Sequence, residues 1–133
     1  MINVPKGGLF LDGEKIFCVI VMVLSCWGCA GLFCGIGYWA KKRKDPMHFY
    51  SGSTVDPKSI SDIPAYNRAN SRMWMTYSIP FWLCGFFSIA GLWASWCGVV
   101  SVVLLCVGSI AGSVWLVLRY QKIRRKFAAD DAN

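Results

Sequence analysis

MWMTYSIPFWLCGFFSIAGLWASWCGVVSVVLLCVGSIAGSVWLVL, residues 73–118, is a stretch of the chain without one charged side chain. A single helix of this length would measure roughly 69 Å at 1.5 Å per residue, about twice the thickness of the hydrocarbon core of a bilayer. The stretch therefore predicts a hairpin of two membrane-spanning helices. Basic residues flank it, with Arg68 and Arg72 before it and a cluster from Arg119 to Lys126 after it. A hairpin brings both basic flanks to the same side of the membrane.

A second uncharged run, from Ile16 to Ala40, is long enough for one more membrane crossing. The composition agrees, because 56% of the 133 residues are hydrophobic and only 16% are charged, against about 25% in ordinary soluble domains. We therefore expect an all-α integral membrane protein with a single membrane domain over residues 1–133. Its three transmembrane helices are predicted at about 16–40, 73–94 and 97–118.

The basic residues also predict an orientation. With three spans, Lys41–Lys44, Arg68, Arg72 and the cluster 119–126 all fall on one face, which the positive-inside rule makes cytoplasmic. The prediction is N-out/C-in, with a cytoplasmic loop at 41–72 and a basic cytoplasmic tail at 119–133. The net charge is +7, and we interpret the basic residues behind it as contacts for anionic lipid headgroups. No nucleic-acid partner is expected, because no basic face with interleaved aromatic residues lies outside the spans.

Two pairs of glycines in the predicted spans have the spacing that lets helix backbones approach closely. Gly31 and Gly35 lie in the first span, and Gly108 and Gly112 lie in the third. Two interpretations stay open. The pairs either pack the helices of one chain together, or they form the interface of a homo-oligomer or of a membrane protein partner.

Seven cysteines lie in or beside the spans, and Cys26 and Cys29 form a C-x-x-C pair. On a helix their sulfurs share a face, the geometry used by membrane thiol oxidoreductases near a quinone. The alternative is packing, since cysteine also serves membrane helices as a small apolar residue. The pair lies mid-span, without a basic group to lower a thiol pKa, which favours packing.

The sequence predicts no catalytic, cofactor or metal site. His48 is its only histidine, and no nucleophile–base set is visible. The spans hold no ionisable Asp, Glu, Lys, Arg or His, which argues against an autonomous ion-coupled transporter. A subunit of an oligomeric channel or transporter remains an alternative.

The most specified polar segment runs from the loop into the second span. Gly52 marks a turn, and Asp62 is expected to cap a helix that continues into the span with Pro64 in its first turn. Arg68 lies on a face from which it reaches lipid phosphates. The residues expected to share the other face are Tyr66, Asn67, Asn70 and Trp74. This segment either hydrogen-bonds the loop back onto the helix entrance or forms a cytoplasmic recognition surface.

The segments PMHFYSGSTV (46–55), ISDIPAYNRAN (60–70) and Met73-Trp74 resemble small, uncharacterised membrane proteins of Firmicutes-type bacteria. Gly52 and the aromatic-x-x-x-Asn pattern from Tyr66 to Asn70 are similar to the SdpI-like family of toxin-immunity and signalling membrane proteins. That family carries Gly-Tyr-Arg-Thr where this chain has Ser53-Thr54 after Gly52. The resemblance implies a multi-pass protein of the bacterial cytoplasmic membrane with an immunity-like role.

Together these patterns predict a non-enzymatic interaction or regulatory membrane protein, which the resemblance makes immunity-like. Its working surface would be the loop and the helix entrance. The alternatives are a membrane thiol–disulfide oxidoreductase that uses Cys26 and Cys29, and a subunit of an oligomeric channel or transporter.

Overall fold

The structure is a computed structural model that describes residues 12–49 and 52–129, and within them it is all-α. Three long helices follow one another: α1 (Gly13–Lys42), α2 (Ile63–Ala90) and α3 (Ser95–Lys126). A short 3-10 helix, η1 (Pro57–Ser59), lies in the loop between α1 and α2. No β-strand forms in the described residues, where one isolated β-bridge joins Ile60 to Ala128. The predicted fold class is confirmed.

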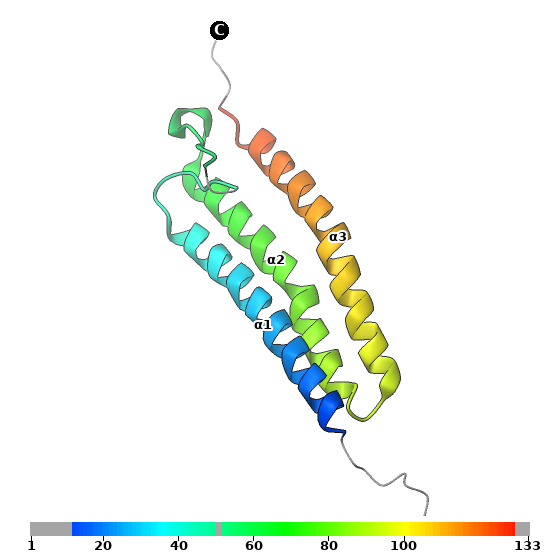
Figure 1. Cartoon of the computed structure of the whole chain (residues 1–133). Coiled ribbons are helices and arrows are strands. Elements are labelled where there is room, and N and C mark those ends of the chain that lie inside the picture. The colour runs from blue at the N-terminus through cyan, green and yellow to red at the C-terminus, as the bar shows by residue number, and fades with distance from the viewer. Residues whose placement is uncertain (1–11, 50–51, 130–133) are drawn as a thin grey trace, which may run out of the picture.

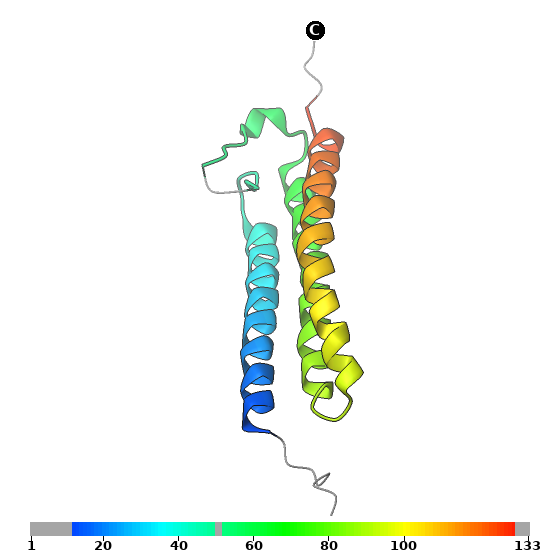
Figure 2. The same ribbon diagram turned by 45° about the vertical axis from the view of Figure 1, so that its right-hand side comes forward.

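The three helices lie side by side, with α1 and α3 each packed against α2 (Figures 1 and 2). We call the end where α1 and α3 finish and α2 begins the loop end. The opposite end, with the start of α1 and the tight connection from α2 to α3, is the turn end. The loop and the last turn of α3 therefore meet, although they are far apart in the sequence.

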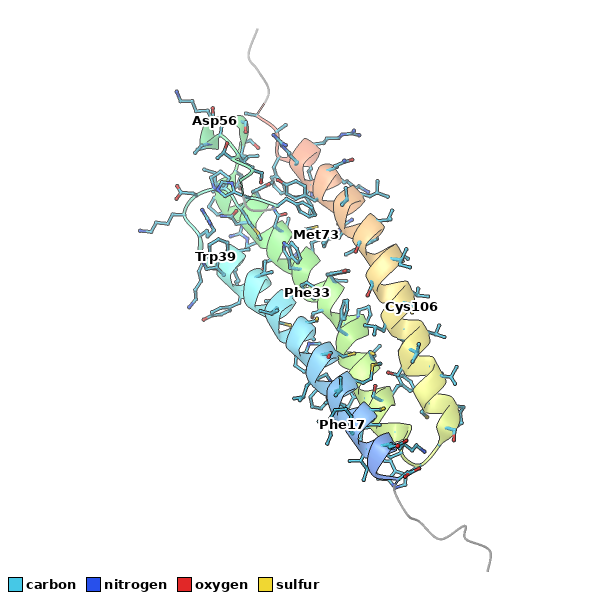
Figure 3. The ribbon with its side chains drawn as sticks, viewed as in Figure 1. Phe17, Phe33, Trp39, Asp56, Met73 and Cys106 are labelled. Atoms are coloured by element: carbon cyan, nitrogen blue, oxygen red, sulfur yellow. The ribbon has the colours of Figure 1, made fainter. Side chains whose placement is uncertain are left out.

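All three helices are long enough and apolar enough to cross a membrane. Their 28 to 32 residues correspond to about 42–48 Å, more than the roughly 30 Å of a hydrocarbon core. Large apolar side chains of the outer helices point away from the bundle, among them Phe17, Leu24 and Ile110 (Figure 3 labels Phe17). Lipid solvates such side chains at no cost, which makes this a membrane-embedded protein.

The boundaries of the hairpin differ from the prediction. The second span was expected to end at 94 and the third to begin at 97, but α2 ends at Ala90 and α3 already begins at Ser95. Gly91 is the C-cap residue, whose N–H still donates to the Phe87 carbonyl, and the backbone becomes extended at Ala94, directly before α3. A Cβ at Gly91 would lie only 3.1 Å from the Gly98 Cα, so the two helices meet tightly there.

The start of α2 follows the prediction. The Asp62 carboxylate accepts a hydrogen bond from the Ala65 N–H at 3.0 Å, and Pro64 lies in the first turn. The helix then continues without interruption past Pro80. The buried face at the start of α2 therefore continues into the membrane-spanning part of the same helix.

Aromatic side chains fill the centre of the bundle. Phe33 of α1 packs against three rings of α2, with centroid distances of 5.9 Å to Trp74, 4.8 Å to Tyr77 and 5.2 Å to Phe81 (Figure 3 labels Phe33). Such stacked and tilted aromatic pairs stabilise a core beyond their buried area. These contacts join α1 to α2.

The two predicted glycine pairs differ in their role. Gly108 and Gly112 pack inside the chain, where an added Cβ would lie 3.2 Å from Pro80 and 2.7 Å from Tyr77. Gly31 and Gly35 have open space around them in the described part of the chain, so packing within one chain is wrong for this pair.

The reason is the rotation of α1 about its axis. Its buried residues are Cys26, Ala30, Gly37 and Ala40, whose spacing of three, four and seven defines one stripe. Residues 31 and 35 lie off that stripe and face outward. The close approach to α2 occurs at Gly37 instead, where a Cβ would lie 2.9 Å from the Ser71 carbonyl oxygen.

Candidate functional site

Asn67 fastens the loop to the start of α2. Its side chain is 1% exposed, and its Oδ1 accepts a hydrogen bond from the Met47 N–H at 2.9 Å. Its Nδ2 donates to the carbonyls of Arg43 at 3.2 Å and Asp45 at 2.9 Å. One amide thus satisfies three backbone groups of the chain that leaves α1, and it holds that chain in a single path.

Tyr66 joins the loop to both hairpin helices. It is fully buried, and its hydroxyl donates to the Met47 carbonyl at 3.2 Å and lies 3.2 Å from the Tyr120 hydroxyl of α3. Asn70, one turn later, donates to the Tyr66 carbonyl of its own helix, at 3.0 Å. Trp74 packs its ring against Phe33 and Phe49. In the described residues, the Oδ1 of Asn70 and the Nε1 of Trp74 have no hydrogen-bond partner.

The end of α3 is fastened to the same loop. The Ser61 N–H donates to the Phe127 carbonyl, and the Ala129 N–H donates to the Ser59 carbonyl, both at 2.9 Å. We call this assembly of residues 43–49, 52–62 and 127–129 the cap. It closes over the loop end of the bundle, as Figure 2 shows above the ends of the helices.

Some residues of the predicted loop motif are therefore buried, and others are exposed. Tyr66, Asn67, Asn70 and Trp74 share one buried face, as their spacing predicted, and they build the scaffold beneath the cap. Buried side chains do not contact a partner, so the geometry agrees with the interpretation that they bond the loop back. Gly52, Asp62 and Arg68 are exposed, and Gly52 has a φ of +91°, which suits the turn expected there.

A basic groove lies between α2 and α3 just below the cap. It has a volume of about 560 Å³. Its basic side chains are Arg68, Arg72, Arg119, Lys122 and Lys126, and none of the lining residues in the described part of the chain is acidic. Met73, Trp115 and Ile123 contribute an apolar floor. We call this cavity the basic groove.

The sequence signals for the groove are the spacings within each helix. Arg68 and Arg72 are four residues apart, and Arg119, Lys122 and Lys126 follow at three and four, so each set lies on one helical face. That the two faces oppose each other across a cavity depends on how α2 and α3 are rotated. The residue pattern alone does not specify this rotation.

The cations at the end of α1 have a different environment. Lys42 lies over the Tyr38 ring and Arg43 over the Trp39 ring, each at 4.4 Å from the ring centroid (Figure 3 labels Trp39). Aromatic rings with long cationic side chains above them are typical of the boundary between lipid and water. This places the end of α1 at the same level as the groove.

The structure brings Cys26 of α1 into contact with a thiol of α2. Its sulfur lies 2.9 Å from the sulfur of Cys84 on α2, and both residues are buried. Cys29 is only partly buried. The alternative redox pair of Cys26 and Cys29 stays a prediction; the thiol that contacts Cys26 is that of Cys84, because the α1 stripe that faces α2 includes residue 26 and not 29.

Two serines continue this contact toward the turn end. The Ser101 hydroxyl donates to the Cys84 carbonyl at 2.9 Å, and Ser88 donates to the same carbonyl at 2.9 Å. The bond from Ser101 joins α3 to α2, as hydrogen bonds from small polar residues do between membrane helices, whereas Ser88 and Cys84 both belong to α2. In the described part of the chain, no three His, Cys, Asp or Glu side chains gather as a metal site would require.

No family model matches this chain, and no curated protein or solved structure shows significant similarity to it. The resemblance to small Firmicutes membrane proteins and to the SdpI-like family therefore stays a prediction. Function has to be inferred from the cap, the groove and the thiol pair themselves.

Proposed function

We propose that this protein is a non-enzymatic interaction or regulatory protein of the bacterial cytoplasmic membrane, with an N-out/C-in orientation. Its working surface would be the loop end, in the cytoplasm. The observation that supports this proposal is the cap, in which a buried tyrosine and asparagine hold the loop and the end of α3 in one arrangement. An immunity-like role follows from the sequence resemblance.

The reasoning starts from what a simple connection between two helices requires. A tether needs no buried polar side chains, which are costly unless every hydrogen bond is made. Asn67 makes three such bonds to the loop, and two backbone bonds tie the loop to the segment after α3. A network of this kind specifies one conformation and so presents a constant outer surface.

Site-specific photo-cross-linking in the producing bacterium tests the proposal. A photoreactive phenylalanine analogue at Lys58, exposed on the cap, should cross-link to a defined protein species. The same analogue at Ile110, which is 73% exposed on the apolar surface of α3, should not give that species. The species should also disappear when Asn67→Ala releases the loop. Cross-links to lipid alone from every exposed cap position would contradict the proposal.

A second candidate function is thiol–disulfide chemistry, which the sulfur contact between Cys26 and Cys84 favours. The two thiols would lose two electrons and two protons to a lipid-soluble acceptor of the quinone class, leaving one disulfide and one quinol. A membrane-soluble acceptor is required because the pair lies mid-span. Alkylation and mass spectrometry of membranes treated with a short-chain quinone should then find a peptide that joins Cys26 to Cys84. Two thiols that stay reduced and unjoined would exclude this function.

A further inference from the structure

We propose that the basic groove binds the headgroup of an anionic phospholipid from the surrounding leaflet, with phosphates held by Arg68 and Arg72 on one wall and by Arg119, Lys122 and Lys126 on the other. The inference rests on the function proposed above only in placing the loop end among the cytoplasmic headgroups. It assigns a ligand class to the groove, which the cap alone does not.

The charge of the groove calls for an anion. Five cationic side chains line one cavity, and among the described residues that line it no acidic side chain offsets them. Like charges gathered over a low-dielectric floor repel one another and focus a positive potential into the cavity. An anion that enters relieves this repulsion. A neutral or zwitterionic headgroup relieves it far less.

The height of the groove matches the level of lipid phosphates. Arg72 directly precedes the uncharged run and Arg119 directly follows it, so the two residues mark the same edge of the apolar zone on facing helices. Lys42 and Arg43 lie over aromatic rings at the end of α1, as cations do at the interface. Basic pockets between helices at this level are known to accept anionic lipid headgroups.

The shape of the groove admits a lipid from the side. Its walls come from α2 and α3 and the residue after α3, while α1 packs on α2 elsewhere (Figure 1). Trp115 lies one turn deeper in the apolar zone than Arg119, is 39% exposed, and offers an apolar surface to acyl chains. A volume of about 560 Å³ is within the range of small-molecule sites. A lipid thus places its phosphates against the basic side chains and its acyl chains against the apolar residues of the groove. A free phosphate interacts with the basic side chains alone.

The chemistry of the rim favours a lipid with two phosphate groups. Arginine binds phosphate through two parallel N–H···O bonds, and the arginines stand on both walls. One phosphate with a single negative charge leaves four of the five positive charges unbalanced. A diphosphatidylglycerol-type lipid carries two phosphates and reaches both walls at once.

Native mass spectrometry of the purified full chain in detergent tests this inference with matched variants. The groove variant Lys122→Gln/Lys126→Gln removes two charges from the lining. The control variant Arg124→Gln/Arg125→Gln removes two charges from the same turns of α3 at exposed positions outside the lining. The unaltered chain and the control should each retain one diphosphatidylglycerol and no phosphatidylcholine. The groove variant should bind it about tenfold more weakly or worse.

A second variant and a soluble competitor complete the test. Arg68→Gln/Arg72→Gln, on the opposite wall, should weaken retention by a similar factor while circular dichroism stays unchanged. Diphosphatidylglycerol should also raise the midpoint of thermal unfolding at a concentration at least about tenfold below that needed of inorganic pyrophosphate. An equal effect of pyrophosphate would make a soluble phosphate compound the ligand and overturn the inference.

Two other results would also overturn it: equal loss of lipid from the groove and control variants, or equal retention of phosphatidylcholine. The measurement is made in detergent, so it depends neither on membrane orientation nor on a protein partner. Failure of lipid binding would leave the proposed interaction role intact. A loop end mapped outside the cell would remove that role and leave the lipid result unaffected.

Discussion

At the scale of single residues, Asn67 and Asn70 are the same amino acid one turn apart, yet the structure gives them different roles. Asn67 bonds three backbone groups of the loop, while Asn70 bonds one carbonyl of its own helix. Both are buried. The two positions therefore separate the effect of holding the cap from the effect of burying an amide.

We expect Asn67→Leu to release the loop and Asn70→Leu to leave it in place. Each buried backbone group that loses its partner costs about 1–3 kcal/mol, and Asn67 serves three such groups. Hydrogen exchange at residues 43–49 measures the outcome. Exchange there should accelerate strongly in Asn67→Leu. It should change little in Asn70→Leu, which makes the same change of side chain at another buried asparagine. Equal protection in the two variants would show that Asn67 does not hold the loop.

At the scale of elements, the packing of α1 on α2 depends on which glycines face the partner helix. Gly85 of α2 receives the Trp27 ring of α1, and a Cβ there would overlap the indole. The Trp27 ring also lies 5.3 Å from Phe86 and 5.9 Å from Trp82. Gly31, by contrast, faces open space in the described part of the chain.

We predict that Gly85→Val lowers the free energy of unfolding by about 1–3 kcal/mol, because the indole has to leave its position. Gly31→Val should change it by less than about 0.5 kcal/mol, since the same side chain there meets no neighbour of this chain. Thermal unfolding of both variants in one detergent gives the comparison. A loss of the same size in both would contradict the assigned rotation of α1.

The Gly31→Val protein has a further use. A homo-oligomer or a membrane protein partner remains our proposal for the outward face of α1, where Gly31 and Gly35 lie beside Trp27 and Trp39. Chemical cross-linking in membranes should then show less oligomer with Gly31→Val than with the unaltered chain. Cross-linking that finds only monomer in both would exclude an oligomer at this face.

How much of these elements the sequence predicts depends on whether the signal is local. The hairpin follows from run length, the start of α2 from Asp62 and Pro64, and the shared face of Tyr66 and Asn70 from helical spacing. Apart from the run length, these signals involve neighbours within about one turn. The boundary of the hairpin turn was misplaced because the apolar run continues through the turn, so that run length does not mark the residue at which α2 ends.

Contacts between helices follow from rotation and register, which a list of residue types does not encode. Gly31 and Gly35 have the same spacing as Gly108 and Gly112, but only the second pair faces another helix of the chain. The thiol contact of Cys26 and the two walls of the basic groove have the same origin. These features became visible only when the helices were placed beside each other.

At the scale of the whole molecule, the two ends of the bundle differ in their construction. The turn end is a tight connection between α2 and α3, closed by Gly91 and Gly98. The loop end carries the cap, the basic groove and the cation–aromatic contacts of α1. We propose, as the central claim, that the loop end faces the cytoplasm and carries the function.

Reporter fusions to the C-terminus test that claim most directly. A fluorescent protein that matures only in the cytoplasm and a phosphatase that needs disulfides, and so is active only outside, are each joined after residue 133. We expect full fluorescence from the first fusion and no phosphatase activity from the second in whole cells, because the basic clusters keep the loop end in the cytoplasm. Active phosphatase with a dark fluorescent fusion would place the cap outside the cell and contradict the account.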